Sequence, residues 1–171
     1  MSTYMQYFFD HSGQVLPVVA VATLWLGFAA LGGAASGVGR MRALDPLVGW
    51  AWIGFVFTTA GVFLATPFTY LAMVTAVMAA GACVWMWRRD GGVVPSVFLR
   101  MLVLTIPFLL LVSAMRASQW DEFSDWMIIP RYMLESDAFP SKHNPYPNAV
   151  FTGYQYSWHF VTYLASRIAG G

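Results

Sequence analysis

The most constraining feature of this chain is the length of its stretches without a charged residue. No Asp, Glu, Lys or Arg lies between Ser12 and Gly39, and a second such stretch extends from Pro46 to Trp87. An α-helix needs about 20 apolar residues to cross the hydrocarbon core of a bilayer. The first stretch is long enough for one crossing and the second for two, so membrane lipid is the expected environment.

Composition and charge agree with that interpretation. Only 10% of the residues are charged, whereas a soluble domain has about 25%. The formal net charge is +1, which gives no reason to expect a nucleic-acid partner. The single cysteine, Cys83, cannot form an internal disulfide and defines no metal site.

The apolar stretches predict four transmembrane helices, over residues 14–37, 47–64, 68–85 and 95–114. Pro67 separates the second helix from the third, because proline and the residue before it resist helical continuation. We therefore expect a tight helical hairpin there and, by the same argument, a kink at Pro107 in the fourth helix. Gly33 and Gly37 favour close helix packing, within the chain rather than in a dimer.

The basic residues predict an orientation. Arg40 and Arg42 follow the first predicted helix, Arg88 and Arg89 follow the third, and the connection between the second and third has neither Lys nor Arg. Short connections rich in Lys and Arg are retained in the cytoplasm. The amino terminus and residues 116–148 should therefore be extracytoplasmic.

The last third of the chain has a different character. Residues 116–148 are polar and contain four prolines, which indicates a structured loop. Residues 149–166 are uncharged but rich in aromatic and hydroxyl side chains, and fit either a fifth transmembrane helix or an interfacial helix. The expected fold is an all-α polytopic membrane protein in three parts: a four-span bundle (1–115), an extracytoplasmic loop with a short amphipathic helix (116–148), and an aromatic helix (149–171).

The sequence SQWDEFSDW at 118–126 concentrates three of the eight acidic residues of the chain. Ser118 and Asp121 match the S-x-x-[DE] pattern of a helix start, and Trp120, Phe123 and Met127 would share one helical face. The pattern predicts a short amphipathic helix on the membrane surface, ended by the proline at position 130.

The chemistry of this segment has two interpretations. Asp121, Glu122 and Asp125 can simply cap and solvate the helix, or they can act as a general base or bind a divalent cation through oxygen ligands. A zinc site is not expected, because His143 and His159 are sixteen positions apart with no cysteine nearby. We interpret His143 as a loop residue and His159 as an interfacial polar group.

The segments WDEFSDW, RYML, DAFPS and YP, between residues 118 and 147, resemble the extracytoplasmic motif of the GT-C membrane glycosyltransferases. The resemblance implies an enzyme that handles a polyprenyl-phosphate-linked sugar in a bacterial inner membrane. Asp121 or Glu122 would then activate the acceptor or hold a divalent cation. The other implied substrate contacts and secondary acids are Trp120, Asp125, Trp126, Arg131, Asp137 and Lys142.

This chain has about half the spans of a GT-C enzyme. The resemblance therefore implies an amino-terminal part, a truncated relative or a chain completed by other membrane subunits. The alternative hypothesis is a small non-catalytic accessory subunit of a larger membrane complex. A transporter is disfavoured, because the predicted spans carry ionisable side chains only near their ends.

Overall fold

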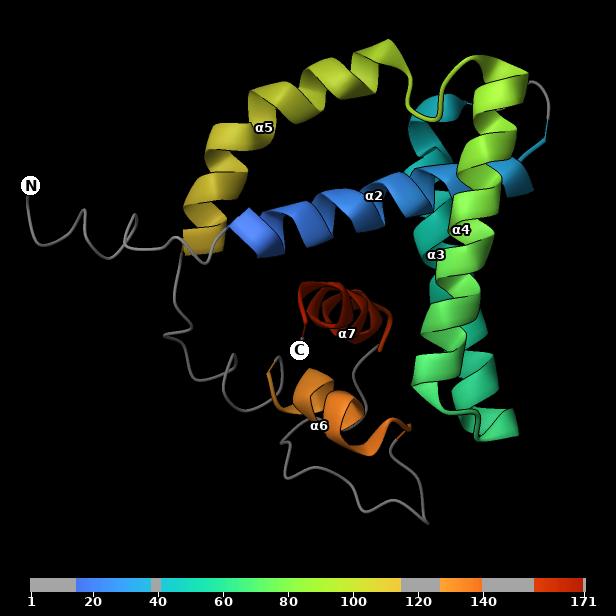
Figure 1. Ribbon diagram of the computed structural model, residues 1–171, viewed down its shortest axis with the longest axis vertical. Helices are drawn as coiled ribbons and strands as arrows, with labels where there is room; N and C mark the ends of the chain where they lie inside the picture. The colour runs from blue at the N-terminus through green and yellow to red at the C-terminus, as the bar shows by residue number, and fades with distance from the viewer. Residues whose placement is uncertain (1–14, 38–40, 115–126, 140–155, 171) are drawn as a thin grey trace, which may run out of the picture.

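The computed structural model describes residues 15–37, 41–114, 127–139 and 156–170, and within these ranges the chain is helical and contains no strand (Figure 1). The elements in chain order are α2 (Val15–Ala35), η2 (Arg42–Leu44), α3 (Asp45–Thr59), η3 (Ala60–Leu64), α4 (Phe68–Asp90), α5 (Ser96–Ala114), α6 (Ile128–Ser136) and α7 (Ser157–Ala169). The all-α class expected from the sequence is confirmed for the described residues.

Three helical segments are long and apolar enough to cross a membrane: α2, the continuous segment Arg42–Leu64, and α4. Their boundaries lie within a few residues of the first three predicted spans. The fourth is different. α5 contains Pro107 and bends along its length (Figure 1), and it is not one of the three segments found long and apolar enough to cross a membrane. A fourth span therefore stays a prediction.

The predicted hairpin is formed by α3 and α4, which run antiparallel on either side of a short turn (Figure 1). At its carboxyl end α3 widens into the π-helical turn η3, and Ala65 then adopts a left-handed conformation with φ of 47°. Pro67 follows with φ of −56° and immediately precedes the first residue of α4. Proline thus breaks the long apolar stretch at the predicted position, because it cannot continue the helix of α3.

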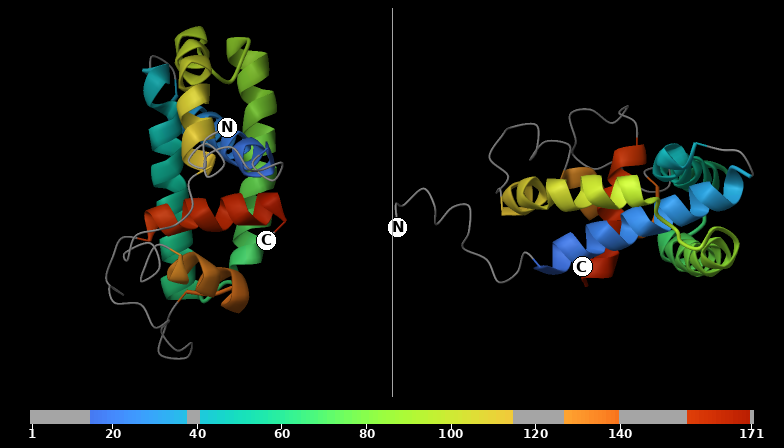
Figure 2. Two further views of the ribbon diagram at one scale, coloured as in Figure 1. Left: turned by 90° about the vertical axis from the view of Figure 1, so that its left-hand side faces the viewer. Right: turned by 90° about the horizontal axis from the view of Figure 1, so that it is seen from above.

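Helix α2 lies across the hairpin at a wide angle, with its carboxyl-terminal half against α3 and α4 (Figures 1 and 2). Close contact depends on glycine. A Cβ atom on Gly32 would overlap the carbonyl oxygen of Asp45, and one on Gly49 would overlap that of Phe28. The small residues therefore pack within the chain, as expected, but the contact uses Gly32 and Gly33, whereas a Cβ on Gly37 would meet no atom within 4 Å.

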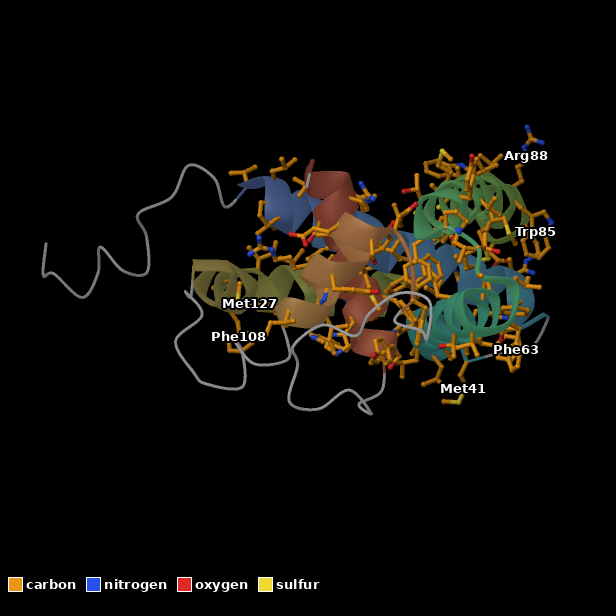
Figure 3. All side chains as sticks on the ribbon, turned by 90° about the horizontal axis from the view of Figure 1, so that it is seen from below. Met41, Phe63, Trp85, Arg88, Phe108 and Met127 are labelled. Atoms are coloured by element: carbon orange, nitrogen blue, oxygen red, sulfur yellow. The ribbon has the colours of Figure 1, made fainter. Side chains whose placement is uncertain are left out.

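Much of the hairpin surface is apolar and exposed. Phe63 and Trp85 project from its outer side (Figure 3), and Val77 is 72% exposed. Further exposed side chains on α4 are Tyr70, Met73, Val74, Met78, Val84 and Trp87. Water would solvate such a surface poorly, whereas lipid tails match it. This exposure is consistent with an integral membrane protein.

Helices α6 and α7 pack against the hairpin near the α3–α4 turn, where α7 crosses it (Figure 2). The core there is aromatic: Phe57 packs on Phe68 and Phe160, with ring centroids 5.6 and 5.3 Å apart. α7 has 13 residues, or about 20 Å of helix, and a crossing needs about 30 Å. α7 by itself is therefore shorter than a crossing, and residues 149–155 of the predicted fifth span lie outside the described residues.

Two further expectations need correction. Pro130 does not end a helix but lies in the first turn of α6, where its missing N–H removes no helical hydrogen bond. His159 is not an interfacial group: it is fully buried in α7, with its ring 5.7 Å from that of Tyr156. His159 is buried because α7 packs on α2 and α3.

Candidate functional site at the start of α4

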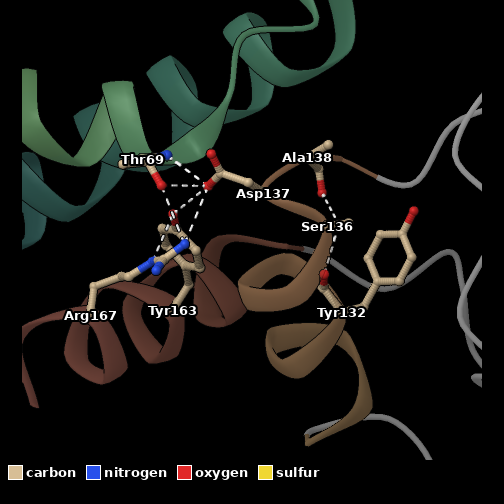
Figure 4. A network of polar contacts seen from close by, with 7 residues as sticks. All are labelled: Thr69, Tyr132, Ser136, Asp137, Ala138, Tyr163 and Arg167. Carbon is tan, nitrogen blue, oxygen red and sulfur yellow. Dashed lines mark hydrogen bonds and ion pairs between the residues drawn. The ribbon is translucent and has the colours of Figure 1, made fainter. Parts of the chain in front are cut away.

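The carboxylate of Asp137 joins three helices (Figure 4). Its Oδ1 accepts hydrogen bonds from the backbone N–H of Thr69 at 2.8 Å, the Thr69 hydroxyl at 2.8 Å and the Tyr163 hydroxyl at 3.0 Å. Its carbonyl oxygen accepts the N–H of Phe68 at 3.0 Å. The first N–H groups of a helix have no partner within the helix, and its N-terminus attracts negative charge. Asp137 therefore caps α4 from another part of the chain.

The local conformation of Asp137 makes this reach possible. The residue ends α6 in a left-handed conformation with φ of 51°, which Asp and Asn tolerate better than most residues. α6 and the α3–α4 turn therefore lie at the same end of α4. Which end faces the cytoplasm stays a prediction.

Arg167 completes this polar cluster from α7. Its Nη2 lies 3.5 Å from Asp137 Oδ1 and donates to the Thr69 hydroxyl at 3.3 Å, while its Nε donates to the Tyr163 hydroxyl at 3.4 Å (Figure 4). All three distances are at the long end of the hydrogen-bond range. The guanidinium is therefore held in place without being tightly bound.

The surroundings shift the ionisation of this cluster. Burial raises the pKa of the Tyr163 phenol, and the hydrogen bonds from Arg167 and Thr69 oppose that shift. The hydrogen bond to Tyr163 raises the pKa of Arg167 further above its already high ordinary value. Near neutral pH, Tyr163 is therefore a neutral donor to the carboxylate and Arg167 is a cation.

An apolar groove begins beside this cluster. It has a volume of about 450 Å³ and is walled by α2, α4 and α7. Its polar end is formed by Thr69 and Arg167, and along α4 it continues to Cys83. With 1.5 Å of rise per residue, those 14 positions span about 21 Å. A charged group at one end of a long apolar groove is complementary to an amphipathic molecule.

The opposite end of α4 has its own charged cluster. Arg42 Nη2 donates to the Gly92 carbonyl at 2.7 Å, and Arg89 Nε bonds Asp90 Oδ1 at 2.8 Å with its guanidinium 4.0 Å above the Trp85 ring. Asp45 is only 1% exposed at the start of α3. These contacts fix the connections between helices, and a further cavity of about 480 Å³ beside them is lined mainly by apolar residues and by Arg88.

The acids expected to carry chemistry, Asp121, Glu122 and Asp125, lie outside the described residues. So do the predicted contacts Trp120, Trp126 and Lys142. Within the described ranges, no group of three His, Cys, Asp or Glu side chains is arranged to hold a metal ion. The divalent cation implied for the acidic segment stays a prediction.

Two of the predicted substrate contacts, Arg131 and Asp137, lie among the described residues, and their surroundings differ. Arg131 lies on the exposed side of α6, where its Nε bonds Glu135 Oε1 at 2.8 Å, and this hydrogen bond raises the pKa of Arg131. Asp137 instead faces α4 and α7, where its Oδ1 already accepts three hydrogen bonds. A carboxylate engaged in this way is better suited to hold helices together than to react.

Three residues of the cluster escaped the sequence analysis: Thr69, Tyr163 and Arg167. Tyr163 and Arg167 are four positions apart and therefore share one face of a helix, which was an available signal. Nothing local links them to Thr69, which is 98 positions from Arg167.

Comparison of the chain with protein-family models, curated protein sequences and solved structures gave no significant match. The class of the protein therefore rests on its own features. Over the residues that the structure describes it is all-α, with three helices long and apolar enough to cross a membrane, consistent with an integral membrane protein.

Proposed function

We propose that this protein is a glycosyltransferase-like membrane protein, or part of one, that handles a polyprenyl-phosphate-linked sugar on the extracytoplasmic side. The membrane environment is supported by the three long apolar helices. The chemistry is supported by the resemblance of residues 118–147 to the GT-C enzymes. In this proposal Asp121 or Glu122 activates the acceptor or holds a divalent cation, and Asp125 assists.

The observation that carries the proposal is the attachment of α6 to the start of α4. The acidic segment ends at residue 126, and α6 begins two residues later at Ile128. At the other end of α6, Asp137 hydrogen-bonds Phe68 and Thr69. These two residues follow the turn between two helical segments that are each long and apolar enough to cross a membrane. An anchor at this position suits a site that takes its substrate from the membrane surface.

The proposal assigns different roles to the remaining candidates. The exposed guanidinium of Arg131, or the side chain of Lys142, would contact the donor phosphate, since both are cations near the acidic segment in sequence. Trp120 and Trp126 would stack on sugar or lie at the headgroup level. Asp137 becomes a positioning residue, because its carboxylate is engaged by Thr69 and Tyr163.

The test is sugar transfer from a polyprenyl-phosphate sugar in membranes containing the full chain and any partners that purify with it. We expect Asp121→Asn or Glu122→Gln to reduce transfer at least a hundredfold, since general acid–base groups contribute about 10²–10⁴-fold. Glu135→Gln is the matched control, because Glu135 is an exposed acid on α6 that forms an ion pair with Arg131. Unchanged lipid-linked and glycan products in the folded Asp121 and Glu122 variants would refute the proposal.

A second candidate is a non-catalytic subunit of a larger membrane complex. It is favoured by a second cavity of about 550 Å³ between α2, α3 and α4, which has an almost entirely apolar lining that includes Trp52 and Trp85. A partner helix could cover such a surface. Native electrophoresis of the protein extracted in mild detergent separates the two hypotheses: a stoichiometric partner with no transfer activity supports the subunit, and an active monomer refutes it.

A further inference from the structure

The groove beside α4 has a cation at one end. Among the described residues, the Arg167 guanidinium uses Nε and Nη2 for contacts of 3.3–3.5 Å, and no acceptor is bonded to Nη1. The side chain is 35% exposed. Guanidinium groups bind phosphate oxygens with two parallel N–H donors. The Arg167 side chain therefore has both the access and the free donors that an anionic phosphate needs.

The nearby carboxylate of Asp137 leaves Arg167 able to bind a phosphate. Asp137 Oδ1 lies 3.5 Å from Arg167 Nη2, but it also accepts shorter hydrogen bonds from Thr69 and Tyr163. Those donors, together with the start of α4, stabilise the carboxylate charge. The pKa of Arg167 lies above its ordinary value, so the guanidinium keeps its full charge.

The groove starts at one end of α4 and is long enough to span one leaflet of a bilayer. If α4 crosses the membrane, Thr69 lies at the headgroup level and Cys83 lies about 21 Å deeper. One leaflet contributes about 15 Å of hydrocarbon. Met73 and Ala76, which line the groove, are both exposed at the surface, so the groove opens sideways to surrounding lipid.

We propose that this groove binds an anionic phospholipid of the surrounding bilayer, with one acyl chain along α4 and the phosphate at Arg167. The volume of about 450 Å³ suits one chain, and the second chain would stay in the bilayer. Bilayer phospholipid is present in large excess, so even a modest affinity fills the site by mass action. This lipid is a resident one, and the proposal does not depend on sugar transfer.

The test is native mass spectrometry of the full chain in detergent, titrated with phosphatidylglycerol or with phosphatidylcholine of the same acyl chains. We expect one phosphatidylglycerol to be retained, with at least tenfold weaker retention in Arg167→Gln and no change in Arg100→Gln. Arg100 is the matched control, because it is an exposed arginine on α5 that does not line the groove.

A second pair of variants tests the groove without altering the charge. Ala76→Phe should block the acyl chain and reduce retention, whereas Val77→Phe, one position along on the outer face of α4, should not. This pair decides the question if Arg167→Gln does not fold. Equal retention of both lipids, unchanged retention in Ala76→Phe, or displacement of phosphatidylglycerol by an equimolar polyprenyl phosphate would overturn the proposal. Sugar transfer in the Asp121 and Glu122 variants is measured separately, so either proposal can fail alone.

Discussion

At the scale of single residues, Asp137 links the end of α6 to both α4 and α7. Its side chain and carbonyl oxygen together satisfy two N–H groups at the start of α4, a position where Pro67 provides no side-chain cap. The same carboxylate also accepts a hydrogen bond from α7. One side chain thus holds together segments that lie almost 70 positions apart in the sequence.

Replacing Asp137 should loosen α6 and α7 from the hairpin. We expect Asp137→Ala to lower the free energy of unfolding by about 1.5–3 kcal/mol, the usual contribution of hydrogen bonds to a charged group. Asp137→Asn should cost less, because the amide oxygen can still accept and Asn tolerates the left-handed conformation. Thermal unfolding in detergent measures both. The control is Glu135→Ala, whose exposed ion pair with Arg131 should contribute little to stability. Equal losses in the two alanine variants would contradict the role given to Asp137.

The raised pKa of Tyr163 predicts that the fold becomes less stable at alkaline pH. Burial raises the pKa of its phenol in the folded state, while the unfolded value is about 10. Between the unfolded and folded pKa values the native state keeps a proton that the unfolded state has lost, so stability falls as the pH rises. Thermal unfolding between pH 8 and 11 should show this decline, and it should be weaker in Tyr163→Phe. An identical pH slope in that variant would exclude Tyr163 as its source.

At the scale of elements, α2 is placed by glycine rather than by its apolar side chains. Hydrophobic residues lie on all faces of α2, and most residues of its first two turns are exposed. What distinguishes its carboxyl-terminal half is the contact of Gly32 with the start of α3 and of Gly49 with Phe28. Backbones can approach this closely because the glycine at each contact carries no Cβ atom.

Substitution of these glycines should separate α2 from the hairpin. We expect Gly32→Ala and Gly49→Ala each to destabilise the fold by about 1–3 kcal/mol, because the added methyl group meets backbone that cannot move aside. Gly81→Ala is the matched control within α4: its Cβ meets no atom within 4 Å, so better helix propensity should raise stability by up to about 1 kcal/mol. Thermal unfolding that ranks Gly81→Ala with the other two would contradict this packing.

At the scale of the whole molecule, the charges divide between the two ends of α4. Arg42 and Arg89 lie with the first and third connections at one end, and Asp137 lies at the turn at the other. Because α4 has 23 residues, these ends are about 35 Å apart, slightly more than the hydrocarbon thickness of a bilayer.

Labelling of single cysteines tests the predicted orientation. In a Cys83→Ala background, cysteine at Met127 or Phe63 should react with a membrane-impermeant maleimide from outside the cell, and cysteine at Met41 only after the membrane is opened. All three side chains are more than half exposed. Labelling of Met127 and Met41 positions from the same side would contradict the orientation and, with it, the extracytoplasmic site.

The sequence alone determined where the long apolar helices lie and that the second apolar stretch breaks at Pro67. It also determined that small residues pack helices together within the chain. These follow from local rules: a crossing length without charge, the stiffness of proline and the small volume of glycine. The sequence could not determine the wide crossing of α2, the burial of His159, or the meeting of Thr69, Asp137, Tyr163 and Arg167. Such contacts join positions up to 98 apart, and only tertiary packing, which selects one arrangement of apolar surfaces among many, brings them together.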